Sequence, residues 1–153
     1  MNRLVCCAAA CLLLLSACTA KEEQVSFDPS ATAQAVLDSG AFSETLEQLD
    51  TQVAVMLFGL EGAAEDYEGS VVYYSTGATS EIVAVIQTGE EGDTETVAQT
   101  LQTWVDSQVE AIRDYQPAEV EKLEHAILEQ RGTTVLLVVA ADWETAAQAV
   151  PGE

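Results

Sequence analysis

The chain has 153 residues, and 5 lysine and arginine residues against 26 aspartate and glutamate residues give it a formal net charge of −21 at pH 7. This length fits one small domain with a short extension and is too short for two ordinary domains. The charge argues against nucleic acid as a partner, because lysine and arginine bind phosphate backbones, and it opposes docking on an anionic membrane face.

The N-terminal segment predicts a secretory leader that ends in a lipid-attachment site. Arg3 precedes an apolar run over residues 4–15, which is shorter than the ~20 residues that span a bilayer. The motif Leu15-Ser16-Ala17-Cys18 resembles the lipobox of bacterial lipoproteins, whose cysteine receives diacylglycerol while the leader is cut just before it. We therefore expect a signal peptide over residues 1–17 and a lipid on Cys18. An ordinary secretory cleavage beside an incidental Cys18 is the alternative.

The cysteines support this interpretation. The chain has 4 of them, and all lie within the first 18 residues, at Cys6, Cys7, Cys11 and Cys18. The mature chain would keep only Cys18, so no disulfide framework could form. We expect residues 18–29 to be the lipidated cysteine with a short polar tether, and residues 30–153 to be a single α+β domain.

The first part of this domain predicts helices and an acidic loop. Residues 31–39 predict a short helix that ends at Gly40. Residues 42–60 are ambiguous, because apolar residues at spacings of three and four favour a helix, whereas Val53-Ala54-Val55 could also be strand. The glycine-containing acidic segment 61–68 predicts a loop.

A β-hairpin and a long helix follow. Residues 70–75 and 82–87 are rich in β-branched and aromatic side chains and flank a turn, so they predict two paired strands. Tyr73 and Tyr74 should then point to opposite faces of the sheet. A helix should run from residue 93 to about residue 115, with Trp104 on its apolar stripe and therefore in the core. A short helical turn over residues 117–123 completes this unit.

The C-terminal part repeats the plan. Residues 126–128 and 134–140 predict two further strands around an Arg131-Gly132 turn, and the unbroken apolar run of the second indicates a central strand. Asp142 should cap a last helix that reaches Val150. The elements together predict an α+β fold: a four-stranded, mainly antiparallel sheet of ββα–ββα order with helices on one face.

The sequence predicts no catalytic residues, no cofactor site and no metal site. The motifs of P-loops, dinucleotide-binding turns and nucleophile elbows are absent. Structural zinc needs about four cysteine or histidine ligands, more than the mature domain offers. Two acidic segments, residues 61–68 and 90–93, could gather a cation such as Ca²⁺, but neither matches the EF-hand loop, so we interpret them as solvated turns.

His125 is the only histidine. It could act as a general base with Glu124 or Asp114 orienting it. We prefer a surface histidine at the boundary of an element, because no nucleophile motif stands beside it.

Three stretches carry a resemblance to a known family. They are residues 74–85 (YSTGATSEIVAV), Tyr115-Gln116-Pro117, and the strand over residues 132–139 that leads to Asp142. Together they resemble a family of lipoproteins from clostridia-like Gram-positive bacteria, catalogued as domain of unknown function 4358, over about residues 31–149. The resemblance implies an envelope-anchored domain and carries no known active residues.

Two classes of function are open. The preferred one is an extracytoplasmic lipoprotein, anchored to the outer face of the cytoplasmic membrane by Cys18, that binds an unknown envelope protein or peptide without catalysis. Gly77 and Glu81 in the turn of the hairpin, and an exposed sheet edge, are its candidate contacts, although for these two residues the sequence favours a purely structural role in the turn. The alternative is a small hydrolase or ligand-binding enzyme that uses His125 and carboxylates.

Overall fold

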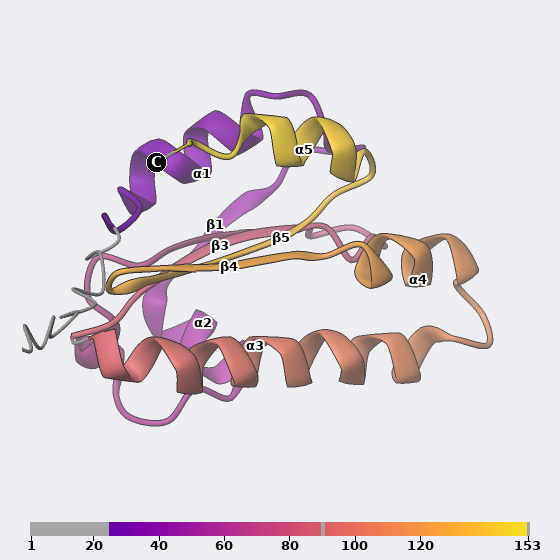
Figure 1. Ribbon diagram of the computed structural model, residues 1–153. Helices are drawn as coiled ribbons and strands as arrows, with labels where there is room; N and C mark the ends of the chain where they lie inside the picture. The colour runs from indigo at the N-terminus through magenta and orange to yellow at the C-terminus, as the bar shows by residue number, and fades with distance from the viewer. Residues whose placement is uncertain (1–24, 90, 153) are drawn as a thin grey trace, which may run out of the picture.

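A five-stranded sheet forms the middle of the molecule (Figure 1). The structure is a computed structural model that describes residues 25–89 and 91–152. The strands follow the order β1-β2-β3-β5-β4, and every neighbouring pair is antiparallel. Their bounds are β1 Glu47–Leu49, β2 Val71–Tyr74, β3 Ile82–Gln87, β4 Ile127–Arg131 and β5 Thr134–Val139. The α+β class is confirmed, whereas the prediction of four strands is wrong.

The additional strand comes from the segment that the sequence left ambiguous. Residues 42–60 contain β1 followed by helix α2, Thr51–Phe58. Asp50 separates them, because its side chain accepts a hydrogen bond from the backbone N–H of Gln52 at 2.9 Å and caps α2. The preference for helix is correct for α2 and wrong for β1, whose three residues are too few to show the alternation of a strand.

Helices cover both faces of the sheet. Helices α1 (Pro29–Leu37) and α5 (Trp143–Ala149) lie on one face, and α2 and α3 (Glu91–Ile112) lie on the other (Figure 1). Helix α4, Pro117–Glu124, lies at one end of the sheet. The prediction of helices on one face only is wrong. The physical reason is that β3 and β5 are apolar on both sides, so each face of the sheet needs a cover.

Two apolar clusters fill the space between the layers. Along β3, Ile82, Ala84 and Ile86 face the cluster beneath α2 and α3, while Val83 and Val85 face the cluster beneath α1. This alternation is the period of two that a strand imposes on its side chains.

The aromatic residues occupy the expected layers. Trp104 is buried in the cluster beneath α3, and its ring meets that of Phe58 edge-on with the centroids 5.2 Å apart. Tyr73 and Tyr74 pack against different clusters, as their alternation predicted. The predicted core position of Trp104 and the opposite orientation of the two tyrosines are therefore confirmed.

Most remaining elements match their predicted ranges. The hairpin, the long helix and the helical turn correspond to β2–β3, α3 and α4, and Asp142 caps α5 by accepting the backbone N–H of Thr145 at 2.9 Å. The acidic segment, residues 61–68, holds one short 3₁₀ helix, Ala64–Tyr67.

Within the described ranges, no helix is long and apolar enough to cross a membrane. The predicted leader and Cys18 lie outside the described residues.

Candidate functional site

Gly77 and Glu81 lie in the turn between β2 and β3, at the end of the sheet where α4 packs. The backbone at Gly77 is exposed, whereas the side chain of Glu81 has 0% of its surface accessible. Glu81 therefore offers a partner no contact surface in this conformation. Its carboxylate instead holds together the three segments that meet here: the residues before β1, the turn, and α4.

Glu81 is the centre of a buried hydrogen-bond network. Its Oε1 accepts the hydroxyl of Ser43 at 2.6 Å and the ammonium of Lys122 at 2.9 Å. Its Oε2 accepts the backbone N–H of Ser43 at 3.0 Å. A buried carboxylate is costly unless it is paired and hydrogen-bonded, and both conditions are met here.

Lys122 links this network to α4. Its ammonium also lies 2.9 Å from Oε1 of Glu119, whose Oε2 accepts the backbone N–H of Ser80 at 2.7 Å. Burial alone would lower the pKa of Lys122, but the hydrogen bonds and charges of Glu81 and Glu119 outweigh it, so the pKa is raised. The lysine thus stays charged and fastens the turn to the helix.

A second carboxylate closes the turn from the other side. Glu44 accepts hydrogen bonds from the hydroxyl of Ser75, which is itself buried, and from that of Thr79 at 2.9 Å. These bonds lower the pKa of Glu44. A Cβ atom added to Gly77 would lie 2.5 Å from Oε2 of Glu44, so the missing side chain is what lets the carboxylate approach.

The result is a turn with a fixed base and an exposed tip. Thr76, Gly77 and Ala78 are exposed, while the residues on either side of them are hydrogen-bonded to Glu44 and packed against α4. The polar groups of the base are bonded to one another, and Oε1 of Glu81 accepts Lys122 as well as Ser43. Such an arrangement is typical of a surface loop that a rigid scaffold holds in place for recognition.

Sequence reasoning singled out the turn and missed its partners. Ser43, Glu44, Glu119 and Lys122 lie far from it in the chain, and Lys122 is 41 residues from Glu81. The sequence did offer one indication of such a partner. Because the chain has 5 lysine and arginine residues against 26 acidic residues, a lysine such as Lys122 could be expected to pair with a carboxylate.

His125 lies away from this network. It is exposed at the C-terminal end of α4, and its Nδ1 is 2.8 Å from the backbone carbonyl of Glu121. Its ring stacks on that of Trp143, with the centroids 4.0 Å apart and the planes 13° apart. The boundary position agrees with the surface interpretation, and neither of the two grooves described below includes His125.

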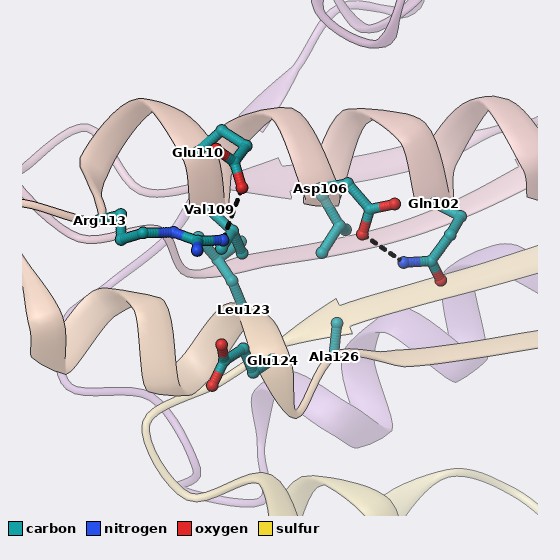
Figure 2. A pocket seen from close by; sticks show the side chains of 9 residues that line it. Gln102, Asp106, Val109, Glu110, Arg113, Leu123, Glu124 and Ala126 are labelled. Carbon is teal, nitrogen blue, oxygen red and sulfur yellow. Dashed lines mark hydrogen bonds and ion pairs between the residues drawn. The ribbon is translucent and has the colours of Figure 1, made fainter.

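A groove of about 530 Å³ runs between α3 and the segment from α4 to β4 (Figure 2). Its apolar residues come from both sides, and its charged residues are three acids and one arginine. The apolar lining is Val105, Val109, Leu123 and Ala126, and the charged lining is Asp106, Glu110, Arg113 and Glu124. Arg113 Nη2 lies 2.5 Å from Glu110 Oε1, in a pair that is largely exposed. The predicted exposed sheet edge contributes no residue to this groove.

A second groove of about 470 Å³ lies between α2 and α3. Phe58 and Trp104 form its apolar part, and the rest is Gly59 and the small or polar α3 residues Thr96, Gln99, Thr100, Thr103 and Ser107. In residues 25–89 and 91–152, no three histidine, cysteine, aspartate or glutamate side chains are grouped so that they could hold a metal ion.

The sequence profile of one protein family, described as Domain of unknown function (DUF4358), matches residues 38–140. The matched range contains all five strands together with α2, α3 and α4, and hence every residue of the turn and its partners. Neither the curated proteins nor the solved structures gave a match.

Proposed function

The chain belongs to the DUF4358 family, and for it we propose the role of an extracytoplasmic lipoprotein that binds an envelope protein or peptide without catalysis. A lipid on Cys18 would hold it at the outer face of the cytoplasmic membrane. The support for this anchor is the motif Leu15-Ser16-Ala17-Cys18 at the end of an apolar run. Because α1 begins at Pro29, the tether after Cys18 is short and the domain would stay close to the bilayer.

The observation that carries the binding role is the fixed turn between β2 and β3. Recognition residues are commonly found on loops that a rigid scaffold positions. Here Glu44, Glu81 and Lys122 hold the base of the turn, and the tip over residues 76–78 is exposed. A preorganised tip loses little conformational entropy when a partner binds. Glu81 acts in this proposal as the residue that positions the turn, and Gly77 belongs to the contact surface.

The enzymatic alternative lacks a comparable observation. His125 has its ring stacked on that of Trp143 and its Nδ1 2.8 Å from the backbone carbonyl of Glu121, and within residues 25–89 and 91–152 neither of these contacts is with a serine hydroxyl or a carboxylate. We therefore prefer the binding role.

The test of the binding role is photo-crosslinking in the native membrane. A photoreactive amino acid at Ala78 should give crosslinked products that are absent when it replaces Gln148, an exposed residue of α5. Glu44→Ala should weaken the Ala78 products, because the turn loses the hydrogen bonds that Glu44 accepts from Ser75 and Thr79. Identical products from both positions, or none from Ala78, would contradict a contact at the turn.

The test of the anchor is separate. Cys18→Ala should remove a lipid-dependent mass increase and release the chain from the membrane fraction. A variant that stays fully membrane-bound would show that Cys18 is not the anchor.

A further inference from the structure

We propose that the groove between α3 and α4 docks a short cationic amphipathic segment of a partner protein. One apolar side chain of that segment would rest on the floor of the groove, and lysine or arginine residues beside it would meet the acidic rim. This inference goes beyond the contact proposed at the turn. Helix α4 serves both places, because Glu119 and Lys122 hold the turn while Leu123 and Glu124 line the groove.

The apolar floor has surface left for a ligand. Val105 and Leu123 are buried, whereas Val109 and Ala126 are half-buried and remain partly accessible within the groove. The volume of about 530 Å³ falls in the range of about 300–1,000 Å³ that is usual for ligand pockets. Partly exposed apolar side chains in a hollow gain free energy when an apolar group covers them.

The charge of the rim selects the partner. Asp106, Glu110 and Glu124 oppose the single cation Arg113, and Figure 2 shows Asp106 and Glu110 on the α3 side of the groove and Glu124 on the α4 side. In residues 25–89 and 91–152, neither Asp106 nor Glu124 forms an ion pair. Cations flanking an apolar anchor would therefore find a carboxylate on each wall, whereas anionic ligands would be repelled.

The protein itself supplies an example of this recognition. Arg113 directly follows the last residue of α3, and its guanidinium reaches back to Glu110, three residues earlier in the chain. Its exposed position makes this intramolecular pair weak. A guanidinium from a partner can therefore replace that of Arg113 beside Glu110 with little loss of free energy. Alternatively, it can bind Asp106 or Glu124, the other two carboxylates of the rim.

The experiment measures peptide binding to the full chain in phosphatidylcholine nanodiscs. The probe is a fluorescein-labelled peptide of leucine and lysine in amphipathic helical order, followed by fluorescence anisotropy. Two further peptides replace every lysine by glutamate, or every leucine by serine. We expect binding of the leucine–lysine peptide only, weakening as NaCl rises from about 0.05 M to about 0.5 M because the rim charges are screened.

A matched pair of variants locates the binding. Asp106→Asn/Glu124→Gln removes the two rim carboxylates and should raise Kd about tenfold. Asp38→Asn/Glu144→Gln removes the same two residue types elsewhere and should change Kd less than about twofold. Asp38 is a close control, because Gln34 Nε2 donates to it at 2.8 Å just as Gln102 Nε2 donates to Asp106 at 2.9 Å.

A third variant tests the floor. Val109→Ser should raise Kd about threefold while the chain still melts cooperatively. Equal losses in the two carboxylate variants would overturn the proposal, since they would show general attraction to an acidic protein. An unchanged Kd for Val109→Ser, or binding of the serine–lysine peptide, would overturn it as well, because the floor would then play no part.

The outcome of the peptide titration is independent of the contact proposed at the turn. Crosslinking at Ala78 reports the turn, and the peptide titration reports the groove. If the peptide does not bind but the crosslinked products at Ala78 are still formed, the contact at the turn is supported. Only the proposal of a cationic partner in the groove is then refuted.

Discussion

The ammonium of Lys122 lies 2.9 Å from Oε1 of Glu81, and the Glu81 side chain is wholly buried while that of Lys122 is 13% exposed. This pair joins α4 to the end of β3, where Glu81 precedes Ile82. Glu81 has no other cation within the described ranges. This buried charge pair, together with the hydrogen bond from the Ser80 N–H to Glu119, therefore fastens α4, and with it one wall of the groove, to the end of the sheet.

We predict that Lys122→Met lowers the free energy of unfolding by about 3 kcal/mol, because it leaves the carboxylate of Glu81 buried without a countercharge. Urea denaturation measures the loss. Arg113→Met is the matched control, since it breaks an exposed pair and should cost no more than about 1 kcal/mol. Glu81→Leu combined with Lys122→Met should recover part of the stability, because no isolated charge remains. Equal losses for the two single variants would contradict this account.

We predict that Gly77→Ala lowers the melting temperature by about 2–4 °C, the shift that about 1 kcal/mol produces in a chain of this size. The added Cβ meets the carboxylate of Glu44, which hydrogen bonds hold in place. In a Glu44→Ala background the same substitution should cost little, because the obstructing oxygens are gone. Additive effects of the two substitutions, measured by thermal melting, would show that the close approach is unimportant.

The pH dependence of stability should reveal the protonation of the Glu44 carboxylate. Hydrogen bonds from Ser75 and Thr79 lower its folded-state pKa below the ordinary value of 4.5. The stabilisation by the ionised carboxylate is thus complete above pH 4.5 and is lost as the pH falls through the lowered pKa. We predict that the gap in melting temperature between wild type and Glu44→Gln is largest near neutral pH and narrows toward about pH 3. A gap that stays constant over this range would be inconsistent with the hydrogen bonds seen here.

Salt should stabilise the chain. Only four carboxylates, Glu81, Glu110, Glu119 and Glu129, take part in ion pairs within the described ranges, so most of the acids repel one another. Screening weakens this repulsion as the Debye length falls from ~30 Å at 0.01 M to ~10 Å at 0.1 M. We predict a melting temperature that rises over that range of NaCl. A flat or falling series would refute the repulsion argument, and a CaCl₂ gain above that of NaCl at matched ionic strength would indicate a cation site in an acidic loop.

The sequence predicted the elements whose pattern is local. Periodicity along α3, the turn residues between β2 and β3, and the capping carboxylate of Asp142 each lie within a few residues of the structure that they specify. Strand β1 was not predicted, because three residues are too few to show an alternation of apolar and polar side chains. Its position depends on pairing with β2.

The presence of helices on the second face of the sheet could have been inferred from the sequence. Residues 82–86 are as continuously apolar as residues 135–140, and a strand buried on both faces needs helices on both faces. The partners of the turn could not be inferred in the same way. Ser75 and Glu44 are 31 residues apart, and only the folded arrangement brings them together.

The middle of the sheet depends on residues near the end of the chain. Strand β3 gains its second neighbour only when β5 is present, with Ile82 opposite Val139. A chain that stopped before Thr134 would leave β3, whose first five residues are wholly apolar and buried, as an open edge. Such an edge is a template for pairing with other chains, so C-terminally truncated products should aggregate rather than persist as a smaller folded domain.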